Sequence, residues 1–223
     1  MELFLIFLIF NGIPIEVHYR PCYLQNLICN RRLQRFFEKC AKEQFSHLVD
    51  GECGVFVVPT SHFNIVYQLV HGFGHLFQEG IGLRQILDYY FVANDFYKVK
   101  VGGPSEASLD CLSAGALRAE LEHLGLYGFA GAMMYVLHEV LELSKDKMIV
   151  PMDVRRGRML LEEILASGNF GRYDERYSFG HGAVWHNLQR LFRDLRLVMY
   201  YPAEALSEPI FRAWHLGWRM WQK

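Results

Sequence analysis

The chain has 223 residues, of which 52% are hydrophobic and 15% are aromatic, so it can bury a sizeable core and is not generally disordered. Its 23 basic and 24 acidic residues nearly cancel, whereas a protein that coats nucleic acid normally shows a basic excess. The five cysteines form no C-x-x-C pair, which argues against a zinc knuckle and against a disulfide framework. We therefore expect a globular protein of the reducing cytoplasm that binds no nucleic acid.

The first twenty residues predict a β-hairpin. Residues 1–10 are mostly Leu, Ile and Phe, but this run is about half of the ~20 residues that a spanning helix needs, and it lacks the basic start of a signal peptide. Asn11-Gly12 is a turn dipeptide, and residues 13–20 alternate between apolar and polar side chains. A buried strand is therefore favoured over a membrane or signal segment. A chain that opens in a buried strand also leads us to expect a missing upstream segment.

Helical periodicity dominates the rest of the chain. A helix is expected at 24–45 and a short strand at 54–58, which Pro59 closes. Further helices are expected at 60–79, 83–97, 105–125, 126–143, 152–165, 184–200 and 204–221, with a Gly-rich aromatic loop at 167–182. The fold class is thus mainly α with a small α+β part at the N-terminus. We expect an α+β domain at residues 1–59 and a helical domain at residues 60–223.

The helix at 60–79 carries a polar ridge on an otherwise apolar surface. The ridge, which spans an arc of about 100°, consists of Asn64, Gln68, His71, His75, Gln78 and Glu79. A helix that buries so wide an apolar face is expected to line a cleft with its remaining stripe. Gly72 and Gly74 each cost about 1 kcal/mol relative to Ala inside a helix, which indicates a close approach at this point.

Two readings of the ridge histidines remain open. His71 and His75 are four residues apart and Glu79 follows one turn later, so these three side chains have the spacing of a metal site. The general-base Glu of the H-E-x-x-H motif is absent, and a hydrogen-bonded or substrate-contacting pair is the favoured reading. In the next helix, Arg84 and Asp88 are placed either to form an ion pair or to offer a guanidinium to phosphate.

The last expected helix carries a stripe of large aromatic side chains. Phe211, Trp214, Trp218 and Trp221 recur on one side of it. Packing of these rings against the helical domain is favoured, and an interfacial membrane anchor is the alternative. On the expected strand at 13–20, the polar residues Glu16, His18 and Arg20 have a simple interpretation as a solvated face.

Several strings together resemble an uncharacterised, Bacteroidetes-type nucleotidyltransferase family of the polymerase-β-type superfamily. They are Ile15-Glu-Val-His-Tyr-Arg-Pro21, the helix from Asn64 to His75, Glu79-Gly-Ile-Gly-Leu-Arg-Gln-Ile-Leu-Asp88, Gly168-Asn-Phe-Gly-Arg-Tyr-Asp-Glu-Arg176, Tyr201-Pro-Ala-Glu204 and Pro209-Ile-Phe-Arg-Ala-Trp-His215. The resemblance covers nearly the whole chain from about residue 12, and the string from Glu79 to Asp88 is its most specific part.

The resemblance implies a function and a set of site residues. It implies transfer of NMP from an NTP to an unknown acceptor by a two-metal mechanism with Mg²⁺, in which Glu16 resembles the third metal-binding carboxylate and is the expected catalytic residue. It further implies substrate-binding roles, for which the expected residues are His18, Arg20, His71, His75, Glu79, Arg84, Gln85 and Asp88.

The chain departs from that family in one respect. The Gly-Ser turn and the Asp-x-Asp strand, which such enzymes carry upstream of the third carboxylate, are not among these 223 residues. One carboxylate does not hold two Mg²⁺ ions that share bridging ligands. The chain therefore resembles the C-terminal two-thirds of the enzyme, either a fragment or one half of a split protein, and is expected to be inactive alone. The alternatives are a non-catalytic module that binds nucleotide or acceptor, and a metal-binding protein that uses His71, His75 and Glu79. No membrane partner is expected.

Overall fold

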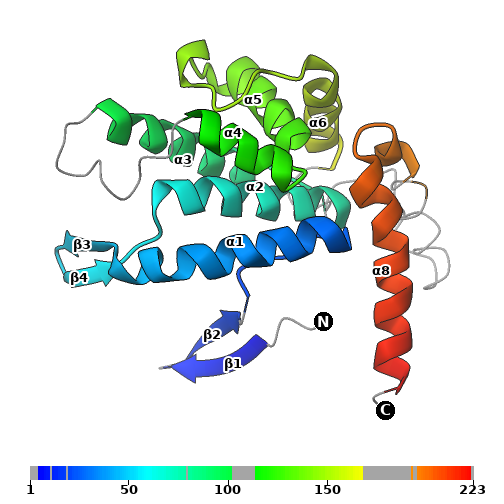
Figure 1. The fold of residues 1–223 in the computed structure, drawn as a ribbon, viewed down its shortest axis with the longest axis horizontal. Helices are drawn as coiled ribbons and strands as arrows, with labels where there is room; N and C mark the ends of the chain where they lie inside the picture. Colours follow the sequence, from blue (N-terminus) through cyan, green and yellow to red (C-terminus); the bar gives the residue numbers. More distant parts are fainter. Residues whose placement is uncertain are drawn as a thin grey trace.

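The computed structural model is mainly helical, with two small antiparallel sheets (Figure 1). It describes residues 5–10, 12–18, 20–78, 80–101, 114–167, 192 and 195–221. The elements are β1 (Leu5–Phe10), β2 (Ile13–His18), α1 (Leu27–Ser46), β3 (Leu48–Gly51), β4 (Gly54–Val57), α2 (Ser61–Gln78), α3 (Leu83–Val101), α4 (Ala114–His123), α5 (Tyr127–Leu141), the 3-10 turn η1 (Lys145–Lys147), α6 (Val154–Ser167) and α8 (Pro202–Trp221). The coarse expectation of a helical protein with a small β-containing N-terminal part is confirmed.

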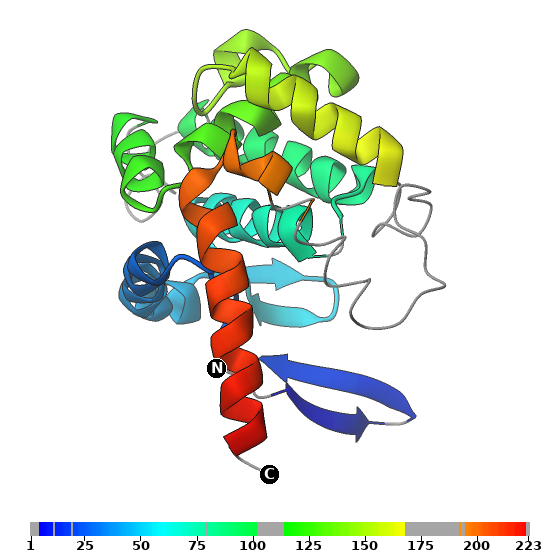
Figure 2. The same cartoon turned by 90° about the vertical axis from the view of Figure 1, so that its right-hand side faces the viewer.

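The N-terminal hairpin forms where the turn dipeptide predicts it. Strands β1 and β2 pair antiparallel, with Phe10 opposite Ile13, and Gly12 takes the positive φ of 79° that the tight turn requires. The expected burial is wrong at the two positions whose side chains are described, because Ile9 is 79% exposed and Ile13 is 65% exposed. The hairpin lies below α1 to α6 (Figure 2), and it forms a sheet of its own. It therefore meets too little of the protein to cover these side chains.

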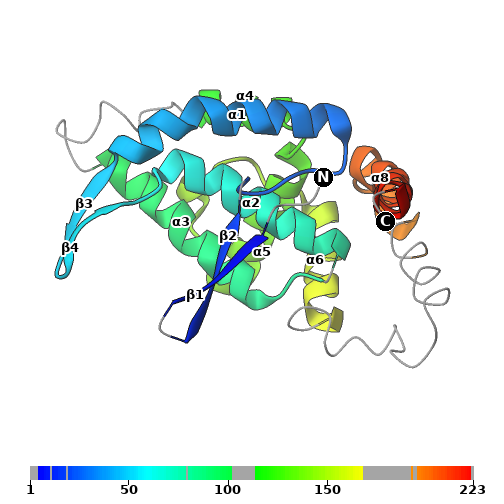
Figure 3. The ribbon, with the colours of Figure 1, turned by 90° about the horizontal axis from the view of Figure 1, so that it is seen from below.

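A second hairpin follows α1, at the far end of that helix (Figure 3). Strand β4 confirms the strand expected near residues 54–58, and it pairs antiparallel with β3, which the sequence reasoning missed. Both strands have exposed side chains throughout. The hairpin is tied to the helix by His47, whose carbonyl accepts from the Val58 N–H at 3.0 Å and whose Nδ1 lies 2.8 Å from the Val58 oxygen.

One hydrophobic core joins the helices. Helices α2 and α3 pack together, as do α5 and α6, and the buried residues of α1 belong to the same cluster as those of α2 to α6. Contact between α1 and α2 is largely aromatic, since the rings of Phe36 and Phe63 stack at 6.4 Å. The core therefore runs across the expected domain boundary at residue 59. Within the described part of the chain, no helix combines the length and the hydropathy that crossing a bilayer requires.

Helix α8 stands apart from this core over most of its length (Figure 1). Its first two turns are held by the body of the protein, because Ala205 and the carboxylates Glu204 and Glu208 are buried. Beyond them, Trp214 is 56% exposed and Trp221 is 86% exposed, so the expected packing of the aromatic stripe on the helical domain is wrong for these two rings. The bundle ends before the helix does.

Candidate functional site

Helix α2 is fixed at both ends by local interactions that its sequence encodes. At the start, the Phe63 N–H donates to Thr60 Oγ1 at 3.3 Å, so Thr60 is the N-cap. Thr60 is itself locked to α1, because its N–H donates to Gln44 Oε1 at 2.7 Å while Gln44 Nε2 donates back to its hydroxyl at 3.1 Å. At the other end, Gly80 has a φ of 94° and its N–H donates to the His75 carbonyl at 2.7 Å, which stops the helix.

The polar ridge of α2 lines a cleft. The apolar side chains of the helix are buried, namely Ile65, Val66, Leu69, Val70, Phe73, Leu76 and Phe77. A cleft of about 550 Å³ runs along the opposite side of the helix, and four of the expected ridge residues line it: Asn64, His71, His75 and Gln78. The expectation of a ridge beside a cleft is therefore confirmed for these four. Glu79, the sixth residue of the predicted ridge, lies outside the described residues.

Four rings form a ladder along this wall of the cleft. Phe63, Tyr67, His71 and His75 are each four residues apart and so lie on one face of α2. Phe63 stacks on Tyr67 at 6.0 Å with an interplanar angle of 11°, and Tyr67 stacks on His71 at 5.9 Å and 12°. The ladder ends in an edge-on contact between the His71 and His75 rings at 4.5 Å and 89°. A row of four aromatic rings thus lines the cleft.

The segment before α1 supplies the facing wall, through Pro21, Cys22 and Tyr23. Gln78 Nε2 lies 3.4 Å from the Tyr23 hydroxyl, so the two walls touch near the end of α2. The Tyr23 ring is backed by α8, because it stacks on Phe211 at 5.7 Å. This wall is therefore built by residues far apart in the chain.

Helix α8 also anchors the segment that follows Tyr23. The Glu204 carboxylate accepts from the Gln25 N–H at 2.5 Å and from the Asn26 N–H at 3.1 Å. Burial raises the pKa of the Glu204 carboxyl, and these two hydrogen bonds act in the opposite direction. Asn26 then caps α1, since its side chain accepts from the Ile28 and Cys29 N–H groups. Glu204 thereby holds the Tyr23 wall at a set distance from α2.

The two helix glycines of α2 serve different purposes. A Cβ at Gly72 would meet the Ile81 Cδ1 at 3.4 Å and the Phe129 ring at 3.8 Å, so the expected close approach is present there. A Cβ at Gly74 would meet nothing within 4 Å, and Gly74 lines the cleft. Gly72 therefore allows helix packing, whereas Gly74 keeps the floor of the cleft open.

Cys22, which also lines the cleft, is buried. Burial raises the pKa of the Cys22 thiol far above its usual value, so the sulfur stays protonated at neutral pH. Burial also raises the pKa of the Tyr67 hydroxyl, which stays neutral as well. The other polar side chains among the described lining residues are the Tyr23 hydroxyl, the two amides and the two imidazoles.

The two histidines form a close pair. Nε2 of His71 and Nε2 of His75 lie 3.1 Å apart, which makes one ring the donor and the other the acceptor, according to tautomer. His71 is exposed and His75 is half-buried, so both edges are reachable from the cleft. This geometry agrees with the favoured reading of a hydrogen-bonded pair.

The remaining expected site residues do not gather at this cleft. Arg84 and Asp88 are exposed at the start of α3, and neither forms an ion pair with any residue that the structure describes. Gln85 is buried, and its side chain accepts from the Gly82 N–H at 3.1 Å, which caps α3. Arg20 is half-buried just after β2. Glu16 and His18 lie on β2, but their side chains, for which catalytic and substrate-binding roles were predicted, lie outside what the structure describes.

Sequence reasoning missed Tyr23 and Tyr67. The place of Tyr67 in the cleft could have been predicted, because it lies four residues before His71 and on the same face as the ridge. The place of Tyr23 could not have been predicted, since it depends on contacts with Gln78 and Phe211, which are remote in sequence.

No described group of three His, Cys, Asp or Glu side chains is close enough to hold a metal ion. The side chain of Glu16 lies outside what the structure describes, so the Mg²⁺ site with Glu16 stays a prediction. Comparisons of the chain with protein-family models, curated proteins and solved structures find no match. The assignment of function thus rests on the cleft and on the sequence motifs.

Proposed function

We propose that this chain is the nucleotide-binding part of a nucleotidyltransferase and that the base lies in the cleft beside α2. The observation that carries the proposal is the ladder of Phe63, Tyr67, His71 and His75 along a cleft of about 550 Å³. Small-molecule sites are typically clefts of about 300–1,000 Å³ lined by apolar and aromatic side chains with a few polar groups. Stacking of a base on an aromatic ring contributes about 1–3 kcal/mol.

The phosphates are assigned to the start of α3. Gln78 is the last described residue of α2 that lines the cleft, and no residue of α3 is among the lining residues. This assignment therefore rests on the sequence motif from Glu79 to Asp88 and not on a contact with the cleft. Arg84 lies in the first turn of α3, and its guanidinium forms no ion pair within the described parts of the chain. A helix N-terminus and an unpaired arginine both favour a phosphate.

Transfer of NMP to an acceptor is the function that the sequence resemblance suggests for the complete active site, with Glu16 and Mg²⁺ in the roles given above. These 223 residues contain no Asp-x-Asp pair to share the metal ions. We therefore expect this chain to bind an NTP without turning it over, in the reducing cytoplasm. The four described cysteines, which are all free thiols, support that compartment.

Blocking the cleft tests the proposal. Gly74→Leu places a side chain in the open floor of the cleft and improves helix propensity, so the fold is expected to tolerate it. Gly217→Leu is the matched control, because Gly217 is also a helical glycine with no atom within 4 Å of its ideal Cβ. We expect a fluorescent ATP or GTP analogue to bind the wild type and the control, and to bind Gly74→Leu at least about tenfold more weakly. Equal binding by all three proteins would exclude the cleft, and failure of all NTPs to bind would reject the function.

A second substitution separates base from phosphate recognition. Arg84→Ala is expected to weaken NTP binding by about 1–2 kcal/mol and to leave nucleoside binding unchanged, since only the triphosphate contacts the guanidinium. Arg31→Ala, an exposed arginine on α1, is the control. If Arg84→Ala binds NTP as tightly as the control does, Arg84 is not a phosphate ligand.

A further inference from the structure

The end of the ring ladder has a second property besides stacking. Nε2 of His71 and Nε2 of His75 lie 3.1 Å apart on successive turns of one helix. Metal–imidazole bonds of about 2.0–2.1 Å place two ligand nitrogens about 2.9 Å apart at a 90° angle and about 3.4 Å apart at a tetrahedral angle. The observed separation lies between these values. The pair is therefore already spaced as two ligands of one ion.

From this geometry we infer that His71 and His75 chelate one divalent first-row transition ion, such as Zn²⁺, Co²⁺, Ni²⁺ or Cu²⁺, at the wall of the α2 cleft. Imidazole nitrogen suits these ions, whereas Mg²⁺ prefers oxygen. The site is thus distinct from the Mg²⁺ site expected around Glu16. Within the described residues these two imidazoles are the protein ligands, and the coordination positions that they leave toward the cleft are open to water or an anionic ligand.

The change needed to admit an ion is small. In the absence of metal, one ring donates its Nε2–H to the lone pair of the other. When the ion binds, the donor ring moves that proton to its own Nδ1, so both rings stay neutral and both Nε2 lone pairs point to the metal. Rotation about the soft terminal torsion of each histidine turns the two Nε2 lone pairs toward the ion.

Neighbouring side chains favour this arrangement. The Tyr67 ring stacks on His71 at 5.9 Å and 12°, which limits the planes that the imidazole can adopt. His71 is exposed and Gly74 leaves the adjoining space open, so an ion can enter from solvent without displacing the core. An orienting contact of this kind raises metal affinity because less ring motion is lost on binding.

The test is a metal titration of protein that carries no histidine tag and no nucleotide. We expect Co²⁺ to produce a saturable visible absorption band, and Zn²⁺ to displace a chromophoric chelator, each at one ion per chain. His71→Asn and His75→Asn are each expected to lose at least about tenfold in affinity. His123→Asn, which removes an exposed histidine of α4, is the control and is expected to bind as the wild type does.

Two further measurements show whether both imidazoles bind the same ion. Bound Cu²⁺ is expected to show hyperfine coupling to two imidazole nitrogens in the wild type and to one in either variant. Zn²⁺ is expected to raise the Tm of the wild type but not that of His71→Asn, because a ligand stabilises only the state that binds it. Absence of saturable binding, or binding that both single variants retain, would overturn the inference. Since no nucleotide is present, this result is independent of the proposed function.

Discussion

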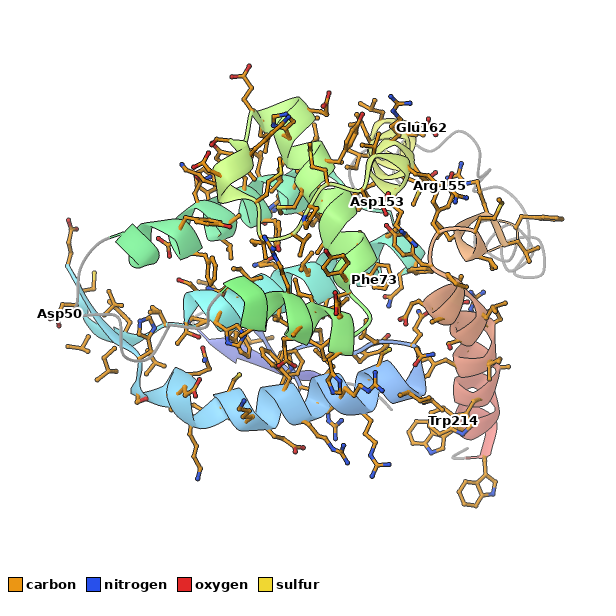
Figure 4. All side chains as sticks on the ribbon, turned by 45° about the horizontal axis from the view of Figure 1, so that its top comes forward. Asp50, Phe73, Asp153, Arg155, Glu162 and Trp214 are labelled. Carbon is orange, nitrogen blue, oxygen red and sulfur yellow. The ribbon has the colours of Figure 1, made fainter. Side chains whose placement is uncertain are left out.

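Helices α2 and α8 are alike in length and in having one strongly apolar face, but the protein covers that face only on α2. The apolar side of α2 lies within the common core, where Phe73 packs against the rings of Phe77, Phe129 and Tyr201 at 5.2, 4.8 and 5.0 Å. On α8, Leu206 and Ile210 are exposed, as is Trp214 one turn later. Figure 4 shows the contrast, with Phe73 among the helices and Trp214 on the part of α8 beyond them.

The difference shows what an amphipathic pattern establishes and what it leaves open. The pattern predicts a helix and the side of it that avoids water, and it does so equally well for α2 and α8. Coverage depends on which other elements reach that side. Helix α2 lies between α1, α3 and α5, whereas α8 meets the body mainly through its first turns and through Phe211 on Tyr23. The cleft lies along α2, where one side of the helix is buried in the core and the opposite side is not.

The largest effect is expected from truncating the covered face. Phe73→Ala removes a ring that is 97% buried and contacts three aromatic neighbours, so it is expected to lower the free energy of unfolding by about 3–5 kcal/mol. Phe73→Leu, which keeps most of the side-chain volume, is expected to lower the free energy of unfolding clearly less than Phe73→Ala does. Urea denaturation measures both. A cost below about 1 kcal/mol for Phe73→Ala would mean that α2 is not covered as the structure shows.

Those parts of the fold that depend on local pattern were predictable. The span of α2 and the cleft beside its polar ridge follow from the helical period and from the distribution of polar and apolar residues around the helix. The turn at Gly12 follows from the Asn11-Gly12 dipeptide. Strand β3 was missed because its apolar pair, Leu48-Val49, is too short to stand out between a helix and Asp50.

Those parts of the site that depend on non-local contacts were not predictable. Tyr23 lines the cleft only because Glu204, nearly 180 residues away, holds the adjoining backbone. The side-chain oxygen of Gln85 accepts from the Gly82 N–H at the start of α3, which is a local contact. A family motif does not distinguish this capping role from substrate binding, so the expected substrate-binding role of Gln85 stays a prediction. The exposure of Trp214 and Trp221 likewise depends on where the bundle ends.

A loss of stability of intermediate size is expected when acid protonates His62, at the start of α2. His62 is buried against the edge of Phe36, and its Nε2 has no hydrogen-bond partner within the described structure. Burial, together with the nearby Lys39, lowers the pKa of His62 from 6.5 to about 4. The unfolded chain therefore takes up this proton near pH 6.5 and the folded chain only near pH 4, so stability falls as the pH drops between these values.

The expected loss from this one group is about 2–3 kcal/mol between pH 6.5 and pH 4, with no further loss below that window. His62→Phe removes the titrating group while keeping an aromatic ring, and it is expected to abolish this part of the acid sensitivity. His123→Ala, at an exposed position, is expected to keep it. Urea denaturation at half-unit steps of pH compares the three proteins. An unchanged pH profile in His62→Phe would show that His62 is not buried in its neutral form.

The smallest effect is expected from the uncovered face of α8. Trp214→Ser and Trp221→Ser remove rings that are 56% and 86% exposed, so each is expected to change the free energy of unfolding by less than about 0.5 kcal/mol. Phe211→Ala, less than one turn before Trp214, is the control. Because the Phe211 ring stacks on Tyr23, this substitution is expected to lower the free energy of unfolding by about 0.5–1.5 kcal/mol more than either tryptophan substitution does. If Trp214→Ser instead destabilises the protein as strongly as Phe73→Ala does, the face is covered in solution. A concentration-dependent Tm would then assign that cover to a second copy of the chain, because only an intermolecular contact responds to protein concentration.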